Sequence, residues 1–222
     1  MPEISIIMLV HNQLDVTRDA IKALRRWSRN YELIVFDNGS DPETEQYLKR
    51  TQSQFPDLIK LIRSNTNIGF IKGCNESAKV AKGDFICCLN NDVLISGPWI
   101  DAMLDVLKRD PTIAQVGAKR LPSHWFMTGS ARSDWYYVEG WCFTIPRCIY
   151  EKFGLFDEVN LEFAYCEDAD LSYRLLEAGY KLAEVHMPIT HARSLTRAAL
   201  SSKIDFIGMH NRNKEYMEKR WK

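Results

Sequence analysis

Three groups of polar side chains have the types and spacing needed to handle a charged substrate. The first is "CLNNDV", in which Asn90, Asn91 and Asp92 directly follow the apolar run "FICCL". A turn explains such a cluster, because Asn and Asp favour turns. A site for a metal-bound phosphate also explains it, because Mg²⁺ and Mn²⁺ prefer carboxylate and phosphate oxygens as ligands. The elements around the cluster have to decide between these two interpretations.

The second group is acidic and lies in "YCEDADLSYRLLEAGY", where Glu167, Asp168 and Asp170 share the first turn of a predicted helix. Acidic residues there complement the helix dipole and cap free backbone N–H groups. Like charges in close contact also raise the proton affinity of one carboxylate, which suits a general base. Spacing alone slightly favours the structural interpretation, and the catalytic one stays open.

The third group is "HMPITHARS", in which His191 follows a short extended piece and precedes Arg193 and Arg197. A single loop histidine is usually structural or solvated. It is also suited to be a neutral metal ligand beside Asp92, with the arginines near phosphate. On its own this signal is weak.

Alternating strands and helices must position these groups. Four apolar runs predict buried strands, and segments with helical features separate them. The strands are "ISIIMLV", "ELIVFD", "LIKLIRS" and "DFICCLN", and the helices cover residues 15–29, 42–54 and 70–81. The second half predicts helices over 99–109, 167–179 and 203–220, strands over 113–118, 137–145 and 181–185, and a loop over 119–133. This order predicts an α/β fold with a mostly parallel central sheet and helices on both faces.

Polar side chains follow each of the first four strands, where open α/β sheets bind their ligands. They are His11 and Asn12, Asp37 and Asn38, Asn65 and Asn67, and Asn90 to Asp92. Together they predict a cleft suited to a base, a ribose and a metal ion. The chain has no G-x-G-x-x-G after its first strand and no G-x-x-x-x-G-K-[ST], which argues against a dinucleotide oxidoreductase and a P-loop enzyme. A cation at Asp92 would then neutralise a diphosphate.

Composition narrows the class of protein. The chain has 222 residues, is 45% hydrophobic and carries 29 basic and 29 acidic residues, so we expect one compact domain and no nucleic-acid partner. Its six cysteines form no C-x-x-C pair, which favours a reduced, cytoplasmic protein over a disulfide framework or zinc site. We expect no signal peptide, and no segment approaches the roughly 20 apolar residues of a membrane span.

In this order, the motifs resemble the family 2 glycosyltransferases of the GT-A fold, in particular the bacterial rhamnosyltransferase-like branch. The matching stretches are "SIIMLVHNQ", "ELIVFDNGSDPET", "NTNIGFIKGCNES", "GDFICCLNNDV", "VEGWCFTIPRCIYEKFGLFDE", "EDADLSYRLLEAGYK" and the tail "HNRNKEYMEKRW". The resemblance covers nearly the whole chain. It implies one GT-A domain over 1–222, with a nucleotide-binding half at 1–95 and an acceptor-binding half at 96–222.

The resemblance also implies roles for individual residues. "NNDV" stands where the family has its D-x-D element, with Asn90 in place of the first acid. Asp92 is then a ligand of Mn²⁺ or Mg²⁺, with His191 as a further ligand. Asp168 matches the catalytic base, with Glu167 as the less favoured candidate. The residues implied for the nucleotide-sugar are Val10, Asn12, Asp37, Asn67, Lys72, Asn75 and Asn91, and those for the acceptor or sugar are Gly140 and Trp141.

The predicted function is therefore an inverting, hexosyltransferase-type glycosyltransferase. Its donor would be a UDP- or dTDP-linked sugar, and its acceptor a hydroxyl of a glycan or lipid-linked glycan. Three alternatives stay open: a nucleotidyltransferase that makes sugar nucleotides, a sugar- or nucleotide-binding module without catalysis, and a retaining transferase. The first lacks its usual Gly-rich basic loop in "HNQLDVTRD".

Two segments with Gly, Ser and Arg, residues 119–133 and 192–202, are predicted to close over the donor and exclude water. The tail "NKEYMEKRWK" mixes basic and aromatic residues. A solvated helix is the favoured interpretation, and a peripheral contact with the inner face of the membrane is the alternative. The oligomeric state is not predicted.

Overall fold

The first half of the chain alternates strands and helices as the sequence predicts. A computed structural model describes residues 1–123, 135–192 and 204–221. The strands are β1 (Ile4–Val10), β2 (Tyr31–Asn38), β3 (Ile59–Ser64) and β4 (Phe85–Leu89). The helices between them are α1 (Leu14–Trp27), α2 (Pro42–Gln54) and α3 (Phe70–Ala78).

Local sequence explains where these elements begin. Asp41 caps α2, because its carboxylate accepts a 2.8 Å hydrogen bond from the Thr44 backbone N–H. Pro42 occupies the first helical position, where its missing N–H costs nothing. Ile7 and Met8 of β1 point to opposite faces of the sheet and are both buried, as expected for a strand covered on both faces.

In its described residues, the second half supplies further strands, four helices and two short ladders. The strands that extend the main sheet are β6 (Ile113–Gly117), β9 (Cys142–Pro146) and β10 (Lys181–Glu184). The helices are α4 (Ile100–Arg109), α5 (Arg147–Phe153), α6 (Glu167–Glu177) and α8 (Phe206–Arg220). The ladders pair β5 (Val93–Ile95) with β11 (Ile189–His191), and β7 (Arg120–Pro122) with β8 (Tyr136–Val138).

Three expectations need correction here. The strand predicted over 137–145 is two strands in different sheets, because the chain turns at 139–141 between β8 and β9. The loop predicted over 119–133 contains strand β7. Helix α5 and strand β5 were not predicted. Of the two predicted closing segments, only residues 119–123 and Ala192 lie inside the described part of the chain.

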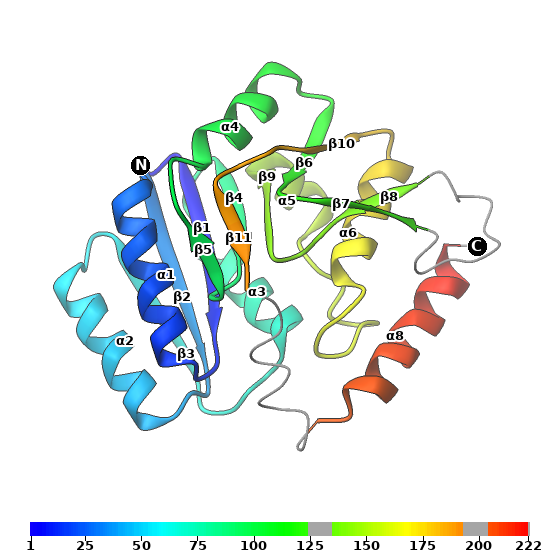
Figure 1. Ribbon diagram of the computed structural model, residues 1–222. Coiled ribbons are helices and arrows are strands. Elements are labelled where there is room, and N and C mark those ends of the chain that lie inside the picture. Colours follow the sequence, from blue (N-terminus) through cyan, green and yellow to red (C-terminus); the bar gives the residue numbers. More distant parts are fainter. Residues whose placement is uncertain (124–134, 193–203, 222) are drawn as a thin grey trace.

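One seven-stranded sheet joins both halves of the chain, in the order β10-β6-β9-β4-β1-β2-β3. Strand β9 runs antiparallel to β4 and β6, and the other neighbouring pairs are parallel (Figure 1). The α/β class with a mostly parallel central sheet is therefore confirmed. Because β4 pairs with β9, the predicted nucleotide-binding and acceptor-binding halves share one sheet.

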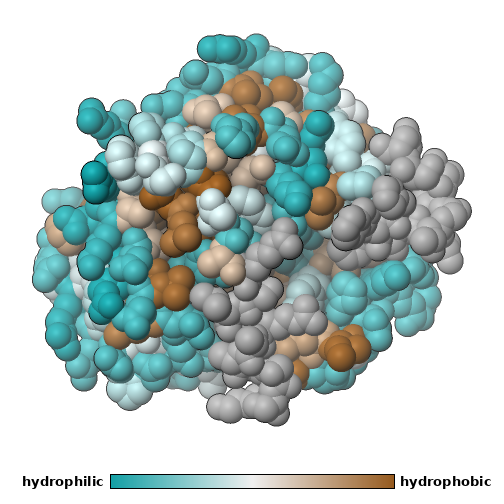
Figure 2. Space-filling model, viewed as in Figure 1, coloured by the Kyte–Doolittle hydropathy of each residue, from teal (hydrophilic) through white to brown (hydrophobic). Residues whose placement is uncertain are grey.

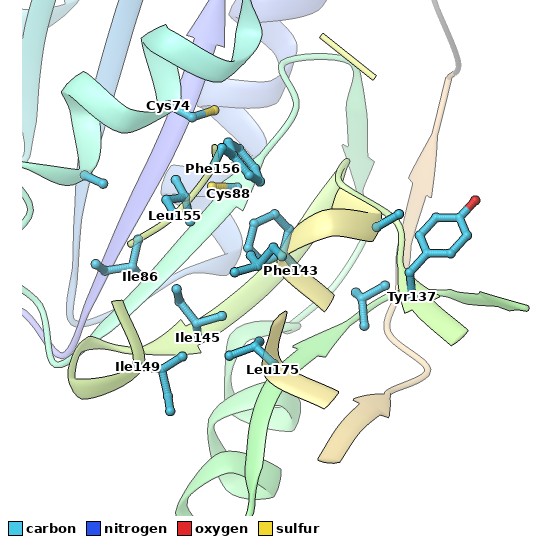
Figure 3. Close-up of a cluster of buried hydrophobic side chains, with 14 of the residues drawn as sticks. Cys74, Ile86, Cys88, Tyr137, Phe143, Ile145, Ile149, Leu155, Phe156 and Leu175 are labelled. Carbon is cyan, nitrogen blue, oxygen red and sulfur yellow. The ribbon is translucent and has the colours of Figure 1, made fainter. Parts of the chain in front are cut away.

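Alternate residues of each strand pack against different helices, so the sheet has a hydrophobic layer on each face. On one face, side chains of β1 such as Met8 pack with α1 and α4. On the other, Ile7 packs with residues of α3, α5, α6 and α8. Figure 3 shows part of this second layer, in which Cys74 of α3 and Cys88 of β4 lie close to Phe156. The central strands are therefore held rigidly at both faces.

Polar side chains cover most of the face seen in Figure 2, and its apolar residues form separate small patches. All six cysteines are free, and only Cys148 is exposed. Within the described residues, no helix combines the length and the apolar character needed to cross a bilayer.

Candidate active site

A cavity of about 330 Å³ opens at the carboxyl ends of the central strands. Both halves of the chain line it. The first half contributes Leu9, Val10, His11, Asn38, Asn67, Phe70 and Asn90 to Asp92. The second contributes Tyr137, Glu139 to Trp141, Phe163 to Tyr165, Glu167, Asp168, His191 and Phe206. Residues of all three polar groups therefore meet in one place, as the strand-end argument expects: Asn90 to Asp92, Glu167 with Asp168, and His191. Asp170 does not line the cavity, and Arg193 and Arg197 lie outside the described residues.

Asp92 and His191 come together through the short ladder of β5 and β11, which lie side by side in Figure 1. His191 pairs with Val93, and the Ala192 N–H donates to the Asp92 carbonyl at 3.0 Å. As a result, His191 Nε2 lies 3.1 Å from Asp92 Oδ1. Sequence alone does not show this ladder, because three-residue strands have no measurable period.

This pair has the geometry of two ligands of one cation. Asp92 Oδ1 is buried without a hydrogen bond, although His191 Nε2 is its near neighbour. The Asn90 amide nitrogen lies 3.3 Å from the same Nε2, a distance at which it donates to the imidazole tautomer whose Nε2 carries no hydrogen. In this tautomer, a cation bound by Asp92 Oδ1 and His191 Nε2 would take the place of the Asn90 hydrogen bond. Ligands at about 2.1 Å on adjacent octahedral positions of Mg²⁺ lie about 3.0 Å apart, close to the distance seen here.

The described side chains do not complete such a site. No cluster of three or more His, Cys, Asp or Glu residues suited to a metal is found in 1–123, 135–192 and 204–221. Diphosphate oxygens and water are the usual further ligands of Mg²⁺.

Trp141 fixes the orientation of His191. The indole stacks on the imidazole with ring centroids 5.1 Å apart and planes 6° from parallel. Its Nε1–H donates to Glu139 Oε2 at 2.9 Å. The turn at 139–141 thereby connects the acidic side of the cavity to the Asp92–His191 pair.

Asp168 lines the same cavity from the start of α6. Its Oδ2 accepts a 3.0 Å hydrogen bond from the Gly140 N–H, and its Oδ1 accepts one from the Ala169 N–H at 2.8 Å. A Cβ on residue 140 would lie 3.3 Å from the Asp168 Cβ, so glycine permits this close approach. Asp168 is partly exposed to the cavity.

Burial raises the proton affinity of both acids at this helix end. It raises the pKa of Asp168 from 3.8 to about 6, against the two backbone hydrogen bonds, and the charge of Glu139 adds to the rise. Burial, followed by the nearby Asp168 charge, raises the pKa of Glu167 from 4.5 to about 8. Glu167 Oε2 is buried without a hydrogen bond. A partly exposed carboxylate that titrates near neutrality is suited to accept a proton from a bound hydroxyl.

Three residues predicted to contact the nucleotide-sugar line the cavity, namely Val10, Asn67 and Asn91. Asn91 is buried and donates to Thr17 Oγ1 at 2.9 Å, which leaves its carbonyl oxygen available. Asn67 accepts from the Gly69 N–H at 3.0 Å and so shapes the turn before α3.

The other four predicted nucleotide residues do not line the cavity. Asp37 is fully buried and forms an ion pair with Arg63, its neighbour across the β2–β3 ladder. Asn12 accepts from the Asp41 N–H at 2.8 Å, and Lys72 is exposed. Asn75 hydrogen-bonds both the N–H and the carbonyl of Phe156, at 3.0 and 2.9 Å. The hydrogen bonds of Asn12 and Asn75 join elements of the fold to each other.

Sequence reasoning missed much of the cavity wall that the second half of the chain supplies. Tyr137, Glu139, Phe163, Tyr165 and Phe206 all line the cavity. The motif "EFAYCED" contains a signal for some of them, because aromatic side chains directly precede the acidic pair. For Glu139, the only sequence feature that indicates a place in the cavity is its position next to Gly140.

Residues 5–159 match the family described as "Glycosyl transferase family 2". Among curated proteins, the O-antigen biosynthesis protein RfbC of Myxococcus xanthus is 27% identical over 237 residues. That match covers 89% of this chain and only 18% of RfbC, so the chain spans less than a fifth of that relative's length.

Solved structures share the fold at lower identity. GalNAc-T7, solved with UDP, GalNAc and Mn²⁺, superposes with a TM-score of 0.71 at 17% identity, over 86% of this chain and 44% of its own. The mannosyltransferase PcManGT of Pyrobaculum calidifontis, solved with GDP-Man and Mn²⁺, superposes with a TM-score of 0.64 at 18% identity. This match covers 83% of this chain and 55% of the PcManGT chain. These likenesses confirm the GT-A-like fold.

Proposed function

The chain belongs to glycosyl transferase family 2, and on this premise we propose that it transfers a sugar from a nucleotide-diphospho-sugar to a hydroxyl group, with inversion at the anomeric carbon. The observation that carries the proposal is a single cavity lined by two sets of functional groups. One set contains Asp168, a partly exposed carboxylate of raised proton affinity. The other contains Asp92 and His191, whose Oδ1 and Nε2 lie 3.1 Å apart and suit a cation.

In the proposed reaction, Asp168 accepts the proton of the acceptor hydroxyl as the oxygen attacks the anomeric carbon. A new carbon–oxygen bond forms on one face while the bond to the diphosphate oxygen breaks on the other, and the bonding pair leaves with the nucleotide diphosphate. The Gly140 and Ala169 N–H groups hold the Asp168 carboxylate in place. A positioned base contributes typically about 10²–10⁴-fold in rate.

A divalent cation is the cofactor of the proposal, as Mn²⁺ or Mg²⁺ held by Asp92 and His191. When bound, it neutralises negative charge on the departing diphosphate. Trp141 holds the imidazole plane toward this position. The Mn²⁺ in GalNAc-T7 and PcManGT supports this assignment.

We assign the donor and the acceptor to different residues of the cavity. Val10, Asn67 and Asn91 are proposed to contact a UDP- or dTDP-linked sugar, and Gly140 and Trp141 the transferred sugar or the acceptor. The acceptor is proposed to be a glycan or lipid-linked glycan in the cytoplasm or at the inner face of the membrane, as the name of RfbC supports. The rhamnosyltransferase-like branch rests on the motifs quoted above.

A direct test compares wild type with Asp168→Asn. The variant should lose transfer and still be stabilised against heat by a nucleotide diphosphate with Mn²⁺, because a ligand at 100 times its Kd stabilises by about 2.7 kcal/mol. Asp157→Asn serves as the control, since Asp157 does not line the cavity. NMR of the product anomer distinguishes inversion from retention.

Other outcomes identify the alternatives. Stabilisation by nucleotides without transfer or donor hydrolysis across a broad panel would establish a binding module. Pyrophosphate release from a nucleoside triphosphate and a sugar phosphate would establish a nucleotidyltransferase.

A further inference from the structure

The acceptor-side wall of the cavity is a loop with an unusual backbone. Phe163, Tyr165 and Cys166 have φ values of 52°, 76° and 68°, in the left-handed region that side chains other than glycine rarely adopt. Phe163 and Tyr165 line the cavity, and Glu167 and Asp168 follow directly. A conformation that these residues disfavour persists only when its surroundings hold it.

Asn213, on the terminal helix α8, holds this loop. Its side chain is 1% exposed and contacts four backbone groups. Its Oδ1 accepts from the Glu162 N–H at 2.9 Å. Its Nδ2 donates to the carbonyls of Glu162 and Ala164 at 2.9 Å and of Tyr165 at 3.1 Å. An amide can both accept and donate in this way, which neither a carboxylate nor an alkyl group can.

The opposite side of the loop rests against α3, so that it lies between α3 and α8 (Figure 1). The Ile71 N–H donates to the Phe163 carbonyl at 3.1 Å. A Cβ on residue 69 would lie 2.8 Å from the Phe163 backbone, so the two segments are in close contact. Aromatic contacts add to those of Asn213: Phe206 meets the rings of Phe163 and Tyr165 edge-on, with centroids 6.3 and 6.0 Å apart.

The far end of α8 also contacts α6. Trp221 Nε1–H donates to Asp170 Oδ1 at 3.3 Å, and Arg220 Nη1 lies 3.4 Å from the same oxygen. Asp170 is fully buried one turn inside the helix that begins with Glu167 and Asp168. Helix α8 therefore contacts both the loop and the helix that together place Asp168.

We propose that Asn213 is a positioning residue for transfer, which sets the aromatic acceptor wall and the direction of Asp168. The inference rests on the proposed function. It assigns to the acceptor a sugar unit whose apolar ring face packs on Phe163 and Tyr165, since aromatic side chains provide flat apolar surface. It also gives the tail helix a role in catalysis without any contact with the reacting atoms.

The test compares Asn213→Ala with Asn211→Ala, an exposed asparagine on the same helix. Asn213→Ala should lower kcat/KM for the acceptor by about 100-fold, the scale expected when reacting groups are misplaced by about 1 Å. Stabilisation by a nucleotide diphosphate with Mn²⁺ should stay within about twofold of wild type in apparent Kd, a readout that general unfolding would not preserve. Asn211→Ala should match wild type in both.

Amide hydrogen exchange gives a second readout that needs no activity. Asn213→Ala should accelerate exchange at Ile71, whose N–H is bonded to the Phe163 carbonyl. Asn213→Ser, which keeps one hydroxyl for hydrogen bonding, covers the case in which the alanine variant does not fold, and should show the same changes to a smaller degree. Wild-type acceptor kinetics in folded Asn213→Ala or Asn213→Ser would overturn the proposal, as would equal loss of nucleotide binding and transfer. A wild-type protein that transfers no sugar would instead contradict the proposed function, while exchange at Ile71 still tests the loop.

Discussion

Replacing Asp168 by asparagine should make the protein more stable above neutral pH while it removes the proposed base. Burial disfavours the charged carboxylate and raises its pKa from 3.8 to about 6. Since one pKa unit corresponds to about 1.4 kcal/mol, ionising Asp168 in the folded state costs up to about 3 kcal/mol. The asparagine carries no charge and avoids this cost.

The net gain is smaller, because Asp168 accepts from two backbone N–H groups through two oxygens. Asparagine has one carbonyl oxygen, so one of these hydrogen bonds is lost, at about 1 kcal/mol. We expect a net stabilisation of about 1–2 kcal/mol at pH 8, or roughly 2–8 °C in Tm for a chain of this size. The Asp168 charge also raises the pKa of Glu167, so removing it lowers the cost of ionising Glu167. This effect further stabilises the variant.

The pH dependence identifies the cause. Between pH 4 and about pH 6 the folded wild type binds a proton at Asp168 that the unfolded chain has lost, so wild-type stability falls as pH rises through this window. Asp168→Asn has no carboxylate at this position, so its stability lacks this fall with rising pH. Relative to wild type, the Tm of Asp168→Asn should therefore be equal or slightly lower near pH 4, where only the lost hydrogen bond counts, and should rise through the window to a net gain at pH 8.

Thermal unfolding followed by circular dichroism measures this difference, with Asp157→Asn as the control. Burial acts to raise the pKa of Asp157, but hydrogen bonds from Asn160, Tyr216 and Val159 lower it overall. Its neutralisation should therefore destabilise the protein at pH 8. If Asp168→Asn melts below wild type at pH 8, or if the difference is the same at pH 4, burial does not penalise this carboxylate and its assignment as a tuned base loses its support.

Three further predictions follow from the cavity and its surroundings. Glu139→Gln should move the acidic limb of the transfer rate to lower pH, because the Glu139 charge helps to raise the pKa of Asp168; an unmoved limb in the pH–rate profile would argue against Asp168 as the titrating base. His191→Ala should raise the Mn²⁺ concentration for half-maximal activity by at least about 10-fold, since even outer partners of a metal ligand are worth about 10–100-fold in affinity; an unchanged Mn²⁺ titration would remove His191 from the site. Asn75→Ala should lower stability by about 1–3 kcal/mol through the lost bonds to the Phe156 backbone. Its stabilisation by nucleotide diphosphate should be unchanged, and weaker nucleotide binding at normal stability would restore Asn75 as a donor contact.

The elements that sequence predicts well are those whose signals are local. The apolar run of β1 and the Asp41–Pro42 start of α2 need only neighbouring residues to be recognised. The polar ends of the strands also meet as expected, because parallel strands bring their carboxyl ends to one edge.

The features that sequence reasoning missed depend on partners distant in the chain. From sequence alone, Asp37 is a candidate to bind a ligand. In the fold, the β2–β3 register places Arg63 directly beside it, and the two form an ion pair. The turn at 139–141 lies inside the largely apolar stretch 137–145, which predicts one continuous strand, and only the contact with Asp168 shows why the chain turns at Gly140. The amide of Asn213 likewise shows its role only when the loop at 162–165 lies against it.

The reversed direction of β9 has a consequence for how the cavity could be redesigned. Because β9 runs against β4 and β6, its first residue lies at the edge where those two strands end. The tripeptide that enters β9 thus reaches the cavity, while the strand behind it stays locked between two neighbours. Since Gly140 contacts Asp168 and Trp141 stacks on His191, exchanging residues 139–141 would reshape the acidic side and the Asp92 side of the cavity together.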